Sequence, residues 1–219
     1  NLTSLKNLVI GNSVTTIGSY AFSSCTGLKK VIWNARNANG FQDDTPFSDC
    51  ENLTEFVFGD EVEHIPDYLC YNLTSLKNLV IGNSVTNIRS HAFKGCTGLT
   101  AVTLPNAMTD IGGWAFAYCT GLTEVTIPNA VTYIGSGAFS GCTGLTEVTI
   151  PNAMTDIGGW AFTYCTGLQT VIWNAHNVQD IPLNKSGTPM PPFLYCKNLT
   201  DFVFGDEVEH IPAYLCYNL

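Results

Sequence analysis

LTEVTIPNAVTYIGSGAFSGCTG, residues 122–144, contains one complete unit of a repeat that runs through the whole chain. Val125 and Ile127 are two residues apart, so they share one face of an extended strand while Thr126 points to the other face. Pro128 ends the strand because proline has no N–H to donate to a β-ladder. The first half of the unit therefore predicts a short strand with one apolar face.

The second half of the unit turns the chain back. Val131 and Ile134 supply a second short apolar edge, and Ala138, Phe139 and Cys142 follow at near-helical spacing. That spacing predicts one turn of α- or 3₁₀-helix that closes the coil. Burying a larger apolar side chain contributes about 1.5–3 kcal/mol, but one coil alone has nothing to bury against, so coils must stack on one another.

The repeat sets the fold. Most units are 23 residues long, and two are 25 and 31 residues long. A period in this range is typical of solenoids. We therefore predict a single leucine-rich-repeat solenoid domain over residues 1–219, with a curved parallel β-sheet, short helical or 3₁₀ turns on the opposite side, and about nine coils. Coils 1 to 9 begin at Leu5, Leu28, Leu53, Leu76, Leu99, Leu122, Leu145, Leu168 and Leu199.

A larger duplication lies above the small repeat. VIWNA at residues 31–35 returns at 171–175, and FVFGDEVEHIP at 56–66 returns at 202–212. The two separations are 140 and 146 residues, so the second copy has gained six residues between these motifs.

The 23-residue rhythm fails in two places, residues 34–46 and 174–192. Irregular loops on a regular scaffold are common sites of function, so we expect these loops to contribute to binding. Both chain ends fall inside a coil without a polar capping repeat, which predicts an excerpt of a longer array. Uncovered end coils would also give weak end-to-end self-association, either head to tail or as a two-fold dimer.

Composition and charge exclude some partners. The formal net charge is -9, and only nine Lys and Arg are scattered through the chain, which argues against nucleic acid as a partner. No run of about 18 apolar residues exists, so we expect no direct insertion into a membrane. The N-terminus has no basic stretch followed by an apolar one, so any export signal has been removed or lies outside this sequence.

The unit L-x-x-V-x-I-P-x-x-V-x-x-I-G-x-x-A-F-x-x-C-x-x-L, read from Leu122 to Leu145, resembles the BspA-like leucine-rich repeats, also called the Treponema pallidum type. The likeness covers essentially the whole chain. Cys70 and Cys216 depart from it at the usual Phe position, and Leu73 and Leu219 depart at the usual Cys position. The resemblance implies an exported or surface protein of a host-associated organism, and several members of the family bind host proteins or other bacteria.

The cysteines recur at one place in the coil. Their odd number and the absence of any C-x-x-C motif argue against disulfides and zinc, so we predict a ladder of buried, reduced thiols. Neighbouring rungs lie within disulfide distance, about 5 Å, but stacked side chains point alongside each other rather than towards each other. The nine residues are Cys25, Cys50, Cys70, Cys96, Cys119, Cys142, Cys165, Cys196 and Cys216.

Enzymatic chemistry lacks a signature in this sequence. No nucleophile elbow, metalloprotease or phosphate-loop motif is present, and the four histidines come from three different phases of the repeat. The acidic group Asp60, Glu61 and Glu63 and its duplicate could bind a cation, or could simply be solvated strand ends. A polysaccharide-acting β-helix enzyme would need clustered acids or bases on one strand face. We expect no basic or nucleophilic neighbours at matching positions for the acidic residues at the third position of the coil, Glu55, Glu124, Glu147 and Asp201. We therefore expect no catalytic residues, no metal and no cofactor.

The fifth position of each coil forms an outward stripe that is apolar at both ends and Thr in the middle. Exposed β-branched residues suit a strand by propensity alone, or they form a protein-binding face. The apolar members are Val9, Ile32, Val57, Val80, Ile172 and Val203.

The sixteenth position carries an aromatic stripe, interrupted by Gly137. An aromatic ladder can stack on sugars, anchor a protein partner or roof the turns against solvent. Its members are Tyr20, Tyr68, His91, Trp114, Trp160 and Tyr214.

These features predict an extracellular or cell-surface binding module. We expect it to be adhesin-like and to recognise a host or bacterial surface protein or glycan through its sheet face and loops. The alternative is a structural spacer that projects another domain of a larger surface protein.

Overall fold

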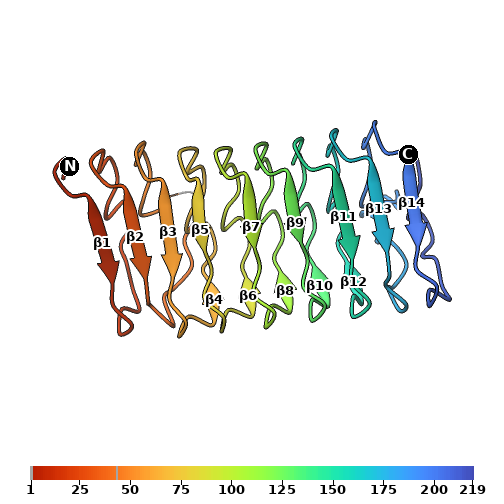
Figure 1. The fold of residues 1–219 in the computed structure, drawn as a ribbon, viewed down its shortest axis with the longest axis horizontal. Coiled ribbons are helices and arrows are strands. Elements are labelled where there is room, and N and C mark those ends of the chain that lie inside the picture. The colour runs from red at the N-terminus through yellow and green to blue at the C-terminus, as the bar shows by residue number, and fades with distance from the viewer. Residues whose placement is uncertain (1, 43) are drawn as a thin grey trace.

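The computed structural model describes residues 2–42 and 44–219. Asn1 lies outside the described residues, and so does Asp43, which belongs to the first predicted loop (34–46). One short strand follows another along the long axis of the molecule, and the two termini lie at opposite ends (Figure 1). Within the described residues, nine strands form the main face. They are β1 (Asn7–Ile10), β2 (Lys30–Trp33), β3 (Glu55–Phe58), β5 (Asn78–Val80), β7 (Ala101–Thr103), β9 (Glu124–Thr126), β11 (Glu147–Ile150), β13 (Thr170–Trp173) and β14 (Asp201–Phe204).

All of these strands pair in parallel, and equivalent residues of successive coils lie opposite one another, as a leucine-rich-repeat solenoid requires. The hydrogen-bonded ladder is not one sheet, however. It divides into β1-β2-β3-β5, β7-β9 and β11-β13-β14. The parallel solenoid predicted from the repeat is confirmed. The strands of its main face form three consecutive sheets and not the single sheet that was predicted.

A second, narrower sheet forms where the V-x-x-I element of the repeat packs inward. Each of its strands ends on a buried Ile, and the order is β12-β10-β8-β6-β4. The strands are β4 (His64–Ile65), β6 (Asn87–Ile88), β8 (Asp110–Ile111), β10 (Tyr133–Ile134) and β12 (Asp156–Ile157).

The core is a series of ladders, in which each buried residue packs on its equivalent in the next coil. The clearest is a stack of five fully buried phenylalanines with ring centroids 5.1–5.4 Å apart and planes 5–14° from parallel. Its members are Phe93, Phe116, Phe139, Phe162 and Phe193. Truncating such a ring to Ala typically costs 3–5 kcal/mol.

The side opposite the strands is built from turns, and the described residues contain no helix, so the predicted helical turn is wrong. Trp114 and Tyr118 have φ angles of 57° and 58°, in the left-handed region, so the stretch between them cannot continue into a right-handed helix at either end. Alternate N–H groups point along the solenoid axis instead: Phe116 donates to the Ala138 carbonyl at 2.7 Å, in the next coil. The same observation means that no described segment is a helix long enough to cross a membrane.

The second irregular loop is only partly a projection. Val178 and Ile181 are each 3% exposed and close the coil as the V-x-x-I element does elsewhere. Beyond them the chain makes a small turn held by an antiparallel bridge between Leu183 and Pro189. The projecting part is therefore about residues 183–189, which is narrower than the 174–192 expected from the broken rhythm.

Candidate functional site

The outward stripe of the strands lies where the sequence predicts it. Val9 is 61% exposed and Val80 is 51% exposed, whereas the inward residues of the same coils are buried or half-buried. Val9, Ile32, Val57 and Val80 are Cα partners in one hydrogen-bonded sheet, so they form a contiguous row that we call the N-terminal apolar patch.

The stripe changes character after coil 4. Thr103 and Thr126 are exposed at the equivalent position, and the apolar side chains return only at Ile172 and Val203, which pair across β13 and β14. The structure therefore brings four of the six predicted apolar residues together and separates the other two from them.

The aromatic stripe packs on itself in the middle of the molecule. The rings of Tyr68 and His91 are stacked with centroids 4.4 Å apart, and Trp114 stacks on His91 at 6.4 Å. A Cβ added at Gly137 would lie 2.8 Å from the Trp114 ring, so the indole packs directly over this glycine and fills the space that a side chain there would take. The ring faces are occupied by neighbouring coils, which favours the roofing interpretation for this part of the stripe.

The remaining members of the aromatic stripe differ from this stack. Trp160 is half-buried, whereas Tyr20 and Tyr214, in the first and last coils, are 54% and 46% exposed. The structure therefore does not bring the predicted aromatic residues into one surface.

A second row of tyrosines was missed by sequence reasoning. Tyr118, Tyr164 and Tyr195 lie four residues before the leucine that starts the next coil, and all three are largely exposed. Tyr164 and Tyr195 stack with centroids 4.8 Å apart. The motif W-A-F-x-Y-C, repeated at 114–119 and 160–165, carries the signal that would have found them.

Lys94 connects the two aromatic rows. Its Nζ lies 5.6 Å from the ring centroids of Tyr71 and Trp114 and 5.9 Å from that of Tyr118. Cation–π contacts of this kind stabilise a surface by about 0.5–1 kcal/mol when they are exposed. The ammonium is thus held within the protein's own aromatic surface.

The cysteine ladder is built from thiol donors. The Cys119 thiol donates to the Phe93 carbonyl of the preceding coil at 3.2 Å, and Cys142 donates to the Phe116 carbonyl in the same way. Burial raises the pKa of Cys119 to about 12, which keeps the thiol protonated and unreactive. Eight of the cysteines are buried, but Cys216 is exposed, so its predicted burial is wrong, because no described coil covers its outer side.

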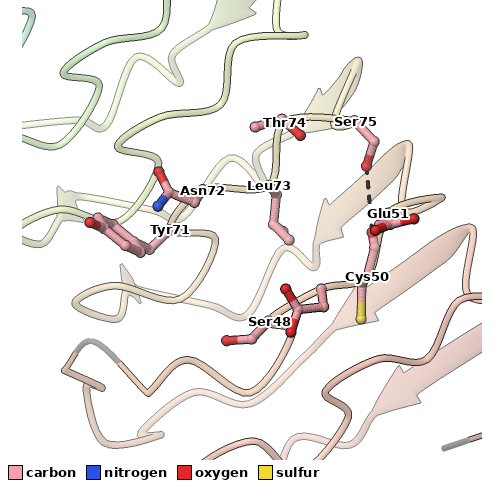
Figure 2. A pocket seen from close by; sticks show the side chains of 9 residues that line it. Ser48, Cys50, Glu51, Tyr71, Asn72, Leu73, Thr74 and Ser75 are labelled. Carbon is pink, nitrogen blue, oxygen red and sulfur yellow. Dashed lines mark hydrogen bonds between the residues drawn. The ribbon is translucent and has the colours of Figure 1, made fainter.

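A shallow pocket of about 360 Å³ lies between the turns of coils 2 and 3 (Figure 2). Its walls carry the side chains of Ser48, Glu51, Asn72 and Ser75, and the Ser75 hydroxyl donates to the Leu53 carbonyl at 2.8 Å. Burial raises the pKa of Cys50, also in its wall, to about 11, so that thiol is no activated nucleophile. The pocket offers hydrogen-bonding groups rather than a catalytic arrangement. Among the described residues, no group of three or more His, Cys, Asp or Glu is placed to hold a metal ion.

Comparison with known proteins identifies the repeat. The model of the BspA type leucine rich repeat region, in six copies, matches residues 1–122, 63–185 and 115–219. No curated protein matches the chain.

Two solved structures share the fold. A leucine-rich repeat protein of T. pallidum (TpLRR) is 21% identical over 89% of this chain and 78% of its own, with a TM-score of 0.61. A leucine-rich repeat protein from Bacteroides ovatus is 21% identical over 93% of this chain and 70% of its own, with a TM-score of 0.58. Because the family model matches the chain from end to end, the protein belongs to the BspA-type leucine-rich repeat family.

Proposed function

We propose that this chain is a non-enzymatic, adhesin-like binding module of an exported or cell-surface protein, and that it recognises a host or bacterial surface macromolecule. The observation that carries the proposal is the N-terminal apolar patch, in which aliphatic side chains from four paired strands form one outward row, with Val9 and Val80 exposed and Ile32 and Val57 half-buried. Contiguous exposed apolar area on a soluble protein usually marks an interaction surface.

The mechanism is burial of this patch under a partner, without a chemical step. Each strand is fixed by hydrogen bonds to its neighbours and by the buried side chains beneath it, so the patch is rigid before it binds. A preorganised surface loses little conformational entropy on association. The projecting turn at 183–189 would add a second contact on the C-terminal part of the molecule.

The test is a binding screen of the immobilised chain against host matrix proteins and glycans, followed by paired variants. Val57→Lys with Val80→Lys should weaken binding of any partner at least about tenfold, because each ammonium would be buried in an apolar contact. The matched control is Thr103→Lys with Thr126→Lys, at the same position of coils 5 and 6, which should leave binding unchanged. Retained binding in the first variant would exclude the patch as the binding face.

A structural spacer is the second candidate, and the continuous stack of buried phenylalanines supports it, because such a rod holds its two ends at a fixed distance. The same screen separates the two roles. A spacer would bind no partner through the patch, and the two pairs of lysine substitutions would behave alike.

A further inference from the structure

Lysines gather along one border of the N-terminal apolar patch. Lys6, Lys29 and Lys77 each occupy the residue after the leucine that starts coils 1, 2 and 4, and all three are exposed. Backbone hydrogen bonds join these positions from coil to coil: Lys29 N–H donates to the Lys6 carbonyl at 2.9 Å, and Thr54 N–H donates to the Lys29 carbonyl at 3.0 Å. The side chains therefore start from adjacent or nearby rungs of one ladder, roughly 5 Å apart per rung.

The same border loses its positive charge in the rest of the molecule. Coils 5, 6 and 7 carry Thr100, Thr123 and Thr146 at the lysine position, and Glu124 and Glu147 lie on the outward face one residue later. In a chain with a formal net charge of -9, the strand face thus has a basic and apolar part over coils 1–4 and an acidic, Thr-rich part over coils 5–7.

Most of this positive charge is not neutralised within the protein. Lys30, on the same face, pairs with Glu55 at 2.7 Å, so the expectation that Glu55 has no basic neighbour at a matching position is wrong. In the part of the chain that the structure describes, no carboxylate lies within 4.0 Å of the Lys6, Lys29 or Lys77 ammonium. These three cations are therefore available to a partner.

We propose that coils 1–4 dock an acidic surface of another protein, whose apolar side chains cover the N-terminal apolar patch while its carboxylates meet Lys6, Lys29 and Lys77. The proposal rests on the proposed function and names the chemistry of its partner. An apolar centre with a polar, solvent-accessible rim is the usual anatomy of a protein–protein interface, and the lysines would lie in that rim. The lysines would steer the approach of an acidic partner and exclude basic ones.

The centre of the surface favours a protein over an acidic glycan. Beside the lysines, three residues further along each coil, lie aliphatic Val9, Ile32, Val57 and Val80, which offer apolar contact area but no aromatic face on which a sugar ring could stack. Burying these side chains stabilises a complex most when the partner covers them with apolar side chains of its own.

The experiment uses the whole chain, immobilised, and three synthetic peptides of about 12 residues. One peptide contains glutamate and leucine, one lysine and leucine, and one glutamate and serine. We expect the glutamate–leucine peptide to bind at least about tenfold more tightly than either of the others, because it alone matches both the charge and the apolar area. Its association rate should fall as salt is raised, since steering by exposed charges is screened.

Charge reversal supplies the decisive variants. Lys6→Glu, Lys29→Glu and Lys77→Glu together should weaken the glutamate–leucine peptide at least about tenfold and shift preference towards the lysine–leucine peptide. The control introduces glutamate at the same repeat position of coils 5–7, Thr100→Glu, Thr123→Glu and Thr146→Glu, and should bind like the original chain. Circular dichroism and melting of both variants check that each remains folded.

Two outcomes would overturn the inference: equal effects of the two triple variants, or tighter binding of heparin than of the glutamate–leucine peptide at the same lysines. The first would show no preference for this border, and the second would identify an anionic glycan as the occupant. If Val57→Lys with Val80→Lys abolishes binding of a screened partner while the lysine reversal has no effect, the proposed function survives and only the acidic partner is excluded. If neither variant has any effect on a bound partner, the N-terminal apolar patch is excluded as the binding face as well.

Discussion

The segment FVFGDEVEHIP occurs twice in this molecule, at 56–66 and 202–212, and the same side chains have different environments in the two copies. Ile65 is fully buried, whereas Ile211 is 54% exposed. The strand that contains the first copy, β3, pairs with β2 on one side and β5 on the other, while β14 pairs only with β13 among the described residues. In a solenoid, burial is thus set by the neighbouring coil and not by the sequence of the coil itself.

The contacts on the inner side of the two copies are nearly the same. Phe56 lies 6.3 Å from Trp33 and 5.6 Å from Phe47, between ring centroids, and Phe202 lies 6.3 Å from Trp173 and 5.6 Å from Phe193. In the core it is the outer neighbour that differs, so the pair of phenylalanines compares a strand covered on both sides with one that pairs on one side only.

The copies also differ in one charge pair. Arg36 pairs with Glu61 in the first copy, and its guanidinium lowers the pKa of that carboxyl. In the second copy His176 stands at the arginine position, with its Nε2 3.4 Å from a Glu207 carboxylate oxygen. Both pairs lie at the surface, with His176 the least exposed member at 31%, so this difference changes the surface more than the packing.

The largest expected effect is the loss of stability when the buried phenylalanine of each copy is truncated. Phe56→Ala should lower the free energy of unfolding by about 3–5 kcal/mol, because a fully buried ring leaves a cavity between two coils. Phe202→Ala should cost less than half as much, since its outer side is already partly open to solvent. Urea unfolding followed by circular dichroism measures both. Equal losses would mean that the outer coil contributes little to the stability of the inner one.

The next effect compares two cysteines at the same place in the duplicated segment. Cys70 is fully buried and its pKa is well above the ordinary value because of burial, whereas Cys216 is exposed. A maleimide should therefore label Cys216 at least about a hundredfold faster than Cys70, which reacts only when its coil opens. Mass spectrometry of peptides from a labelling time course distinguishes them. Similar labelling rates at both positions would show that coil 3 opens so readily that Cys70 is as accessible to the maleimide as exposed Cys216.

Much of the fold followed from the repeat. The 23-residue period predicted the parallel strands, and the alternation in residues such as Val125 and Thr126 predicted which side chains point inward. The turn side did not follow, because left-handed φ angles are expected at Gly and Asn but are adopted here by Trp114 and Tyr118. The signal was Gly137, which stands at the repeat position of Trp114 and has the same left-handed φ.

The candidate site followed only in part. The apolar row was predicted because its members recur at one repeat position, and the structure places four of them in one sheet. The lysine border was missed because Lys6, Lys29 and Lys77 are at least 23 residues apart and form no cluster in the linear sequence. Aligning the coils by their first leucine would have shown it.

A smaller effect concerns the irregular loop of the second copy, which is six residues longer than that of the first. Deleting residues 184–188 should change the free energy of unfolding by less than about 1 kcal/mol, since these residues lie in the projecting turn and loop length costs little entropy. Deleting 179–187 should cost several times more, because it removes buried Ile181 and the N–H of Gln179, which donates to the Thr155 carbonyl at 3.2 Å. Thermal melting of both deletions decides. If the longer deletion is as harmless as the shorter, the second copy closes its coil without Ile181.

The smallest effect sharpens the comparison at His64, which is half-buried, whereas His210, at the same position of the second copy, is exposed. Burial, and to a lesser degree the nearby Arg89 guanidinium, lowers the pKa of His64 below its ordinary value of 6.5, against the opposing influence of Glu63 and Asp67. The unfolded chain then binds more protons than the folded one as pH falls below 6.5, so the stability that His64 contributes is complete above that pH and is progressively lost below it.

His64→Gln should flatten this loss, because glutamine keeps hydrogen-bonding capacity but does not titrate. Urea unfolding at a series of pH values from about 7 to 5, with and without the substitution, measures the difference, which cancels carboxylate titrations common to both proteins. An identical pH dependence in the two proteins, or a His64 proton resonance that titrates above 6.5, would show that coil 4 does not shield this imidazole from solvent.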